Sequence, residues 1–220
     1  MNYVIDVLII IFLFGLYALI HSYLASIKVK EWFKRNFGDL IAFYRLGYNI
    51  FALASLYLIY ELSPKPYLIL YDLPNPYDLI ILMPQFLALA GLFWAFKYIC
   101  FKEFLGLNQV KRYFEKNYNS ELDENLTLQL EGPFRYTRHP VYFFSILILL
   151  FRPTMDLFYL VFFLCIVIYF YIGSYFEEEK LTKHFGKIYT VYRKSVPKIF
   201  PVKFLEPYRT KDLSKLRRKD

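Results

Sequence analysis

Cysteine, histidine and glycine are all scarce in this chain of 220 residues, which contains 2 Cys, 3 His and 8 Gly. Cys100 and Cys165 lie in apolar stretches far apart in the sequence, so no disulfide framework and no cysteine-based metal site is expected. Three scattered histidines do not have the spacing of a metal-ligand cluster either. We therefore expect neither disulfide bonds nor a bound metal ion.

Apolar residues, in contrast, are abundant: the chain is 57% hydrophobic and 22% aromatic, with a mean hydropathy of +0.31. Four apolar runs are long enough as helices to cross a hydrocarbon core of about 30 Å. A fifth, Val141–Phe151, would rise only about 16 Å as a helix. The long runs are Val4–Leu24, Ala42–Leu62, Leu79–Cys100 and Leu157–Phe176. The pattern predicts an all-α integral membrane protein with five apolar segments.

The fourth and fifth apolar segments are separated only by residues 152–156, so we expect them to form a helical hairpin. The last helix should continue beyond the membrane through Phe185, because nothing interrupts it before Gly186. We expect this C-terminal helix and the tail to be cytoplasmic. The predicted regions are N-terminal transmembrane helices (1–101), a cofactor-binding catalytic region (102–200) and a basic cytoplasmic tail (201–220).

The basic residues are distributed asymmetrically about these segments. Of the 27 Lys and Arg, only Lys65 and Arg152 fall on the side of the membrane opposite to the others. The positive-inside rule then places the N-terminus outside the cell inner membrane and the C-terminus in the cytoplasm. The net charge of +8 follows the membrane boundaries, so we expect lipid headgroups rather than nucleic acid as its partner.

Polar residues concentrate at the two ends of the predicted hairpin. Pro140 suits the first turn of a helix, so backbone N–H groups and the side chains of Arg138 and His139 should lie at a helix N-terminus, which favours anions. The hairpin would bring Glu177 and Glu178 to the same place. One wall of the site would be cationic and the other anionic, which suits a zwitterionic or sulfonium-bearing cofactor.

A structural interpretation is equally compatible with these residues. Arg138 could pair with Glu177 or Glu178 while His139 caps the helix, which would anchor the hairpin at the level of the headgroups. The chemistry of the residues by itself leaves both interpretations open.

The order of the motifs resembles that of one family. The chain has Gly-Pro-Phe-Arg-Tyr-Thr-Arg-His-Pro-Val-Tyr at 132–142, Glu-Glu at 177–178, Phe185-Gly186-x-x-Tyr189-x-x-Tyr192, and Val196-Pro197. This succession resembles the membrane-embedded methyltransferase superfamily, which includes isoprenylcysteine carboxyl methyltransferases and phospholipid methyltransferases. The resemblance implies S-adenosyl-L-methionine as the cofactor. It implies a cofactor-binding role for Arg138, His139, Pro140, Tyr142, Glu177, Glu178 and Tyr192.

The N-terminal half resembles the branch that contains methanethiol S-methyltransferases and NnrU-like proteins. The motifs concerned are His21-Ser22-x-Leu24-Ala25-Ser26, Tyr44-Arg45-Leu46-x-Tyr48-Asn49 and Leu105-Gly106-Leu107-x-Gln109. His21 and Arg45 could form a polar contact between helices, or they could line the substrate site.

We therefore expect transfer of a methyl group from S-adenosylmethionine to a small or amphiphilic acceptor, with a thiol favoured. His139 and Arg138 are the candidate catalytic residues, because a base or a nearby cation favours the reactive thiolate. The alternatives are isoprenylcysteine carboxyl or phospholipid amine methylation, an NADPH-dependent membrane reductase, and a non-catalytic NnrU-like binding protein. The sequence does not indicate the oligomeric state.

Overall fold

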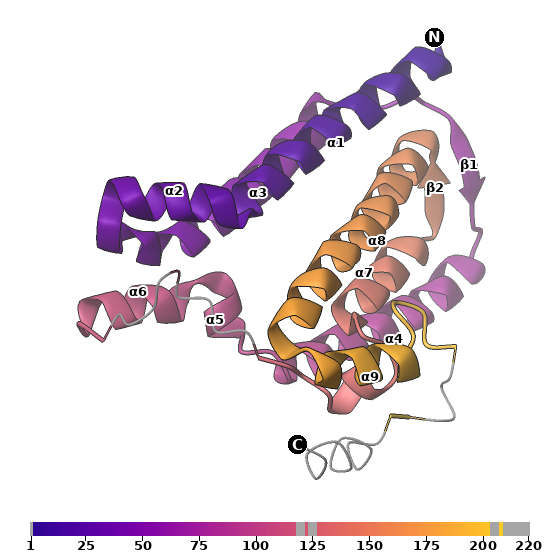
Figure 1. The fold of residues 1–220 in the computed structure, drawn as a ribbon. Coiled ribbons are helices and arrows are strands. Elements are labelled where there is room, and N and C mark those ends of the chain that lie inside the picture. Colours follow the sequence, from indigo (N-terminus) through magenta and orange to yellow (C-terminus); the bar gives the residue numbers. More distant parts are fainter. Residues whose placement is uncertain (1, 118–121, 123–126, 203–206, 209–220) are drawn as a thin grey trace. The chain divides into compact units, whose positions relative to one another are not determined.

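The computed structural model describes residues 2–117, 122, 127–202 and 207–208. Within these ranges the chain is mostly helical, with two short strands (Figure 1). The long apolar helices are α1 (Tyr3–Ala25), α3 (Ile41–Leu62), α4 (Tyr77–Lys97) and α8 (Leu157–Phe185). The shorter elements are α2 (Ile27–Phe37), η1 (Gly38–Leu40), β1 (Ile69–Asp72), α5 (Phe101–Leu105), α6 (Leu107–Phe114), η2 (Gly132–Arg135), α7 (Pro140–Leu150), β2 (Thr154–Asp156) and α9 (Lys187–Ser195).

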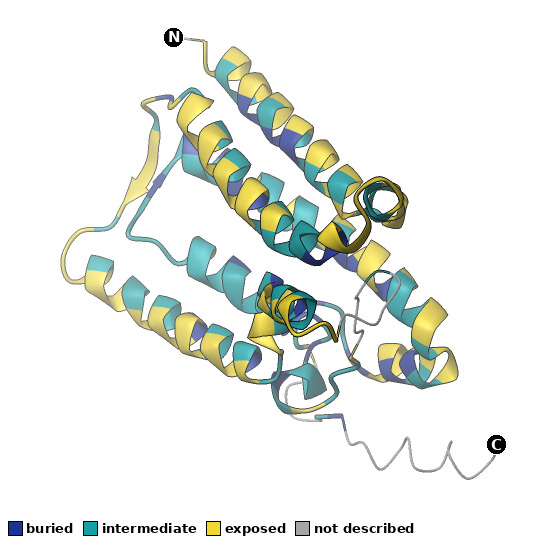
Figure 2. Ribbon diagram, turned by 90° about the vertical axis from the view of Figure 1, so that its left-hand side faces the viewer, coloured by how far each residue is buried: buried dark blue, intermediate teal, exposed yellow. Residues whose placement is uncertain are grey.

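Four helical stretches of the described chain are long and apolar enough to cross a membrane: α1, α2 with α3, α4, and α8. Exposed residues run along these helices (Figure 2), and many of them are large apolar residues. Leu19, Leu53 and Leu87, for example, are 72%, 71% and 73% exposed. Apolar surface of this extent is typical of a membrane-facing surface, which indicates an integral membrane protein. α7, with 11 residues, is shorter, and a fifth crossing stays a prediction.

The chain consists of two compact units, each made of several segments. The first contains Met1–Leu68, Cys100–Asn125 and Asp156–Cys165, and the second contains Ile69–Ile99, Leu126–Met155 and Ile166–Asp220. Helix α8 begins in the first unit and ends in the second. The predicted division into regions 1–101, 102–200 and 201–220 concerns function and stays a prediction.

Aromatic side chains form the core of the first unit, where α1 packs against α3 (Figure 1). Phe14 of α1 meets Phe162 of α8 edge to face, with ring centroids 5.4 Å apart. Tyr60 of α3 meets Phe158 in the same way at 5.2 Å. Such edge-to-face pairs add to the stabilisation that burial of the rings provides.

The segment after α1 differs from the expectation. The apolar runs Val4–Leu24 and Ala42–Leu62 leave a basic stretch between them in which no helix is expected from hydropathy, whereas the structure contains helix α2 there. Ser26 is its N-cap, and its hydroxyl accepts a hydrogen bond from the backbone N–H of Val29 at 3.5 Å. Lys34 and Arg35 lie in the last turn, where cations are favoured by the helix dipole. The cap and the charges explain a helix that hydropathy alone does not reveal.

In the second unit, α7 packs closely against α4. A Cβ atom on Gly91 would lie 2.2 Å from Cε1 of Phe144, so only glycine permits this approach without displacement of the ring. The side-chain amide of Gln85 on α4 donates a hydrogen bond of 2.8 Å to the carbonyl of Ile148 on α7. These contacts place the short apolar helix firmly beside a long one.

The predicted hairpin of α7 and α8 is present, but its connection is more than a turn. Strand β2 lies in this connection and pairs with β1, which is far away in the sequence. The hydroxyl of Thr154 donates a hydrogen bond of 2.6 Å to the carboxylate of Asp72. The all-α expectation omits this two-stranded sheet, because pairing over such a separation leaves no local pattern.

Candidate cofactor site

The site begins at the sequence Arg138-His139-Pro140, where the chain enters α7. Pro140 occupies the first turn of the helix, and His139 precedes it with non-helical angles of φ −125° and ψ 65°. Proline is favoured at this position because its missing N–H would have no partner within the helix. The two polar side chains are therefore held at the entrance of α7, as the sequence predicts.

The backbone N–H groups of this corner do not face a ligand, and here the expectation was wrong. The N–H of Arg138 donates to the carbonyl of Pro197 at 3.0 Å, and that of His139 donates to the carbonyl of Lys198 at 3.1 Å. The hydroxyl of Thr137 lies 2.7 Å from the carbonyl oxygen of Ile199. The segment after α9 thus satisfies these donors, because buried N–H groups need a partner.

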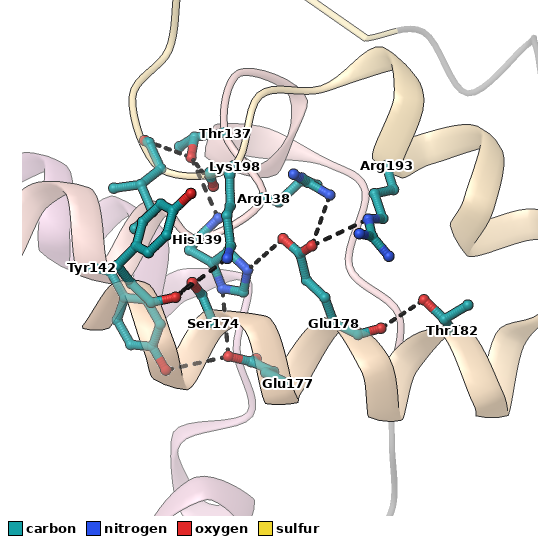
Figure 3. A network of polar contacts seen from close by, with 12 residues as sticks. Thr137, Arg138, His139, Tyr142, Ser174, Glu177, Glu178, Thr182, Arg193 and Lys198 are labelled. Atoms are coloured by element: carbon teal, nitrogen blue, oxygen red, sulfur yellow. Dashed lines mark hydrogen bonds and ion pairs between the residues drawn. The ribbon is translucent and has the colours of Figure 1, made fainter. Parts of the chain in front are cut away.

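Glu178 of α8 is at the centre of the site (Figure 3). One of its oxygens, Oε1, is 3.1 Å from Nε2 of His139. The other, Oε2, is 3.0 Å from Nη1 of Arg138 and 3.4 Å from Nε of Arg193 on α9. The Glu178 side chain is only 3% exposed. The two ends of the hairpin therefore meet, and both carboxylate oxygens are engaged by cations.

Glu177, the preceding residue, has different surroundings. Its side chain is 50% exposed. Its Oε2 is 3.4 Å from Nδ1 of His139 and accepts a hydrogen bond of 3.2 Å from the hydroxyl of Tyr142. The rings of His139 and Tyr142 are stacked with centroids 5.3 Å apart, and Tyr142 stacks on Phe170 at 4.6 Å. Glu177 is thus oriented by two rigid partners but accessible.

His139 lies between the two carboxylates, and this position determines its charge. A carboxylate only accepts hydrogen bonds, so both ring nitrogens must carry a proton to be satisfied. Burial of the ring opposes that charge, but the hydrogen bonds to Glu177 and Glu178 outweigh burial and raise the pKa of His139 above its ordinary value of 6.5. His139 is therefore held as an imidazolium, a hydrogen-bond donor with no lone pair to accept a proton.

Positive charge exceeds negative charge around the glutamate pair. Besides Arg138, His139 and Arg193, the ammonium group of Lys198 is close enough to act electrostatically on Glu178. Burial lowers the pKa of Lys198, and Glu178 opposes this shift. The Nε atom of Arg138 is buried and has no hydrogen-bond partner among the described residues. The cluster therefore has unused capacity to bind an anionic group.

Tyr192 supports this corner rather than facing the carboxylates. Its hydroxyl donates a hydrogen bond of 2.6 Å to the carbonyl of Phe134, and burial raises the pKa of Tyr192 above its ordinary range. It packs in a buried cluster with Tyr189, Val196 and Tyr208. These contacts give Tyr192 a structural role, and the cofactor contact that the resemblance implies stays a prediction.

The motifs do not point to Arg193, Lys198, Thr137 or Phe170 as residues of the site. Arg193 and Lys198 follow directly on motif residues, namely Tyr192 and Pro197. This adjacency is the signal that the sequence offers, but it is too weak to distinguish a cation of the site from the many basic residues expected at the headgroups.

His21 and Arg45 belong to the first unit, where both have structural partners. Nε2 of His21 is 2.6 Å from the hydroxyl of Tyr48. The guanidinium of Arg45 donates through Nε to the carbonyl of Phe104 at 3.1 Å, and the amide of Asn49 donates to the same carbonyl at 3.1 Å. A polar contact between α1 and α3 is therefore present, but His21 makes it with Tyr48, and Arg45 contacts α5 instead. The proposed role of His21 and Arg45 in substrate binding stays a prediction.

Comparison with known proteins provides independent information on this arrangement. No family model matches the sequence, and no solved structure matches it. The chain is 28% identical over 196 residues to methanethiol S-methyltransferase of Crocosphaera subtropica, an alignment that covers 86% of this chain and 72% of that protein. It is 27% identical over 201 residues to methanethiol S-methyltransferase 1 of Bradyrhizobium diazoefficiens, with 89% and 67% covered.

These similarities, together with the apolar helices, support the resemblance of the chain to the membrane-embedded methyltransferase family. Within that family the methanethiol S-methyltransferase branch is the one that the chain is similar to. The resemblance inferred from the motifs is thereby confirmed over most of the chain.

Proposed function

We propose that this protein is an integral membrane methyltransferase that transfers a methyl group from S-adenosylmethionine to the sulfur of a small thiol. One observation supports the proposal above the others: Nε2 of His139 lies 3.1 Å from Oε1 of Glu178, so the basic and acidic ends of the hairpin form a single site. The names of the two relatives support the methyltransferase class and a thiol acceptor.

The residues of the site fit this cofactor. Its amino-acid part carries a carboxylate, and the excess of cations around Glu178 can receive it. These cations include the Nε of Arg138, which has no hydrogen-bond partner in the described part of the chain. Its ammonium and sulfonium groups are positive, and the carboxylate of Glu178 provides negative charge to match them. A simple boundary ion pair explains the contact between Arg138 and Glu178, but not the surplus of positive charge around it.

S-adenosylmethionine, when bound, would supply a methyl group attached to a sulfonium sulfur. The carbon of this methyl group is open to attack by the sulfur of a thiol. The contribution of the chain to an in-line displacement of this kind is alignment and exclusion of water. The stacked rings of His139, Tyr142 and Phe170 provide a rigid wall for that alignment. As an imidazolium, His139 serves as a donor and a positive charge rather than as the base that the sequence left open.

The membrane placement belongs to the same proposal. The distribution of Lys and Arg favours an N-terminus outside the cell inner membrane and a cytoplasmic C-terminus. A cytoplasmic site is reached by a water-soluble cofactor, while an apolar thiol has access through the bilayer. A reporter fused to either terminus tests the orientation.

The decisive experiment uses membranes that contain the protein and S-adenosylmethionine labelled on its methyl group. The acceptors offered are small thiols, prenylcysteines and phospholipids. Label in the methyl thioether supports the proposal, whereas label only in lipid or in a prenylcysteine ester overturns the choice of sulfur. The purified protein is tested for binding of S-adenosylmethionine and of NADPH. Binding of NADPH alone indicates a reductase, and binding of neither indicates a non-catalytic protein.

A further inference from the structure

The two neighbouring glutamates of the site are not equivalent. Glu178 is 3% exposed, and both of its oxygens are engaged, Oε1 by His139 and Oε2 by Arg138 and Arg193. Glu177 is 50% exposed, and its contacts with His139 and Tyr142 both involve Oε2. Among the described residues, Oε1 of Glu177 makes no hydrogen bond. Both oxygens of Glu178 are thus bound by cations, whereas Oε1 of Glu177 has no hydrogen-bond partner among the described residues.

The free oxygen of Glu177 belongs to a carboxylate with a defined orientation. Oε2 is held by the hydroxyl of Tyr142 at 3.2 Å and by Nδ1 of His139 at 3.4 Å. The two donors are themselves fixed, because their rings are stacked with an interplanar angle of 5°. A base must be positioned before it is useful, and here one oxygen is anchored while the other is accessible.

We propose that Glu177 is the catalytic residue that accepts the proton of the thiol during methyl transfer, an inference that rests on the proposed function. A lone pair of the thiol sulfur forms the new bond to the methyl carbon. The bond between that carbon and the sulfonium sulfur breaks, and its electron pair stays on that sulfur. The S–H proton passes to Oε1 of Glu177 and then to water. Charge and atoms balance without a further reactant.

Two other groups of the site are excluded from this role by their contacts. His139 donates through both nitrogens and has no lone pair to offer. Glu178 is engaged by three cations, and a proton on it would compete with all of them. A carboxylate is a sufficient base because the thiol proton becomes strongly acidic as the sulfur gains positive charge. Glu177 is thus assigned to proton transfer from the thiol, whereas the resemblance implied a role in cofactor binding.

The test compares Glu177→Gln with Glu178→Gln on acceptors of different acidity. Glutamine keeps an oxygen that accepts from Tyr142 and His139 but takes up no proton. We expect Glu177→Gln to lower turnover of an alkyl thiol, protonated at neutral pH, by about 100-fold or more. An aromatic thiol that is already ionised needs no base, so its turnover should fall by less than about fivefold. Formate should restore alkyl-thiol turnover in Glu177→Ala.

Binding of S-adenosylmethionine, measured by calorimetry on the purified protein, is the second readout. Glu177→Gln should bind it within about threefold of the unmodified protein, whereas Glu178→Gln should bind it at least about 30-fold more weakly. Glu179→Gln is the matched control, because it removes the same charge one residue further along at an exposed position, and it should change neither readout.

Three results would overturn the inference. These are an equal loss of turnover for alkyl and aromatic thiols, loss of cofactor binding in Glu177→Gln, and full alkyl-thiol turnover in that variant. A wild-type protein that methylates no thiol at all would instead overturn the proposed function, and the two failures are thereby distinguished.

Discussion

Each unit of the molecule contains a carboxylate beside arginine, partly buried at Glu103 and buried at Glu178, and the two are used differently. Arg112 forms a bidentate pair with Glu103 in the first unit, with hydrogen bonds of 3.1 Å and 2.8 Å. The side-chain amide of Gln109 donates a further hydrogen bond of 3.1 Å to Glu103. The hydrogen bond from Arg112, against the opposing effect of burial, lowers the pKa of Glu103. One arginine satisfies this carboxylate, as in an ordinary structural ion pair.

Glu178 in the second unit is surrounded by more positive charge than one carboxylate requires. Arg138, His139 and Arg193 contact it directly, and Arg138 still has an unpartnered Nε among the described residues. A structural pair gains nothing from such an excess, because buried charge that is not compensated is costly. The contacts of Glu103 suffice for a structural ion pair, whereas the excess of cations around Glu178 supports the proposal that its cluster binds a charged ligand.

The largest expected effect is that of Glu178→Ala. The substitution leaves Arg138 buried without its carboxylate, which should weaken binding of S-adenosylmethionine by about 100-fold or more and lower stability by about 3–5 kcal/mol. Calorimetric binding and thermal unfolding of the purified protein measure the two effects. Unchanged binding in a folded variant would show that the cluster of Glu178 is structural, like that of Glu103.

The substitution Glu103→Gln tests the structural role of the carboxylate in the first unit. It removes the charge that Arg112 contacts, so the free energy of unfolding should fall by about 2 kcal/mol. Binding of S-adenosylmethionine by the folded variant should not change. A clear loss of affinity without loss of stability would contradict the structural role assigned to Glu103.

A third prediction concerns pH and follows from the raised pKa of His139. The imidazolium stabilises the folded protein through Glu177 and Glu178. This contribution is complete below the ordinary pKa of 6.5 and is lost as pH rises through the raised value. A tenfold change in the proton affinity of His139 on folding corresponds to about 1.4 kcal/mol of stability.

Thermal unfolding measured from below pH 6.5 upward follows the loss of this stabilisation. The variant Glu103→Gln, which keeps His139, serves as a control. The variant His139→Gln should lack this part of the pH dependence. Arg138, Arg193, Lys198 and the hydroxyl of Tyr142 also face the carboxylates that contact His139, and the variant His139→Gln keeps all four groups. Equal pH profiles for the unmodified protein and His139→Gln would contradict the assignment.

The smallest effect is expected in the first unit, from Tyr48→Phe. This change removes the hydrogen bond between the Tyr48 hydroxyl and His21, at a cost of about 1 kcal/mol. The apparent KM for the thiol should stay the same if His21 is structural. A raised KM in both Tyr48→Phe and His21→Ala, at unchanged affinity for S-adenosylmethionine, would instead support the role of His21 in substrate binding.

The long helices could be predicted from sequence because apolar length is a local property. The runs expected at 42–62 and 157–176 correspond to α3 and α8, and Gly186 ends α8 as predicted. Helix α2 and the pairing of β1 with β2 were missed. The first depends on the cap at Ser26 and on charges in its last turn, and the second depends on residues that are far apart in the sequence.

The site was predicted in part for the same reason. Arg138, His139, Glu177 and Glu178 stand at the two ends of a hairpin, so a local fold was enough to bring them together. Arg193 could not be separated from the other basic residues of the C-terminal part, because its role depends on where α9 returns to the site.

Local sequence is enough to predict the apolar segments, the proline corner at the start of α7 and the acidic pair that meets it. Contacts between distant segments are needed to learn that residues 197–198 accept the N–H groups of Arg138 and His139, that His139 is an imidazolium, and that Glu177 and Glu178 differ in exposure. Helix formation depends on neighbouring residues, whereas ionisation and hydrogen bonding depend on which distant groups the fold brings within about 3 Å.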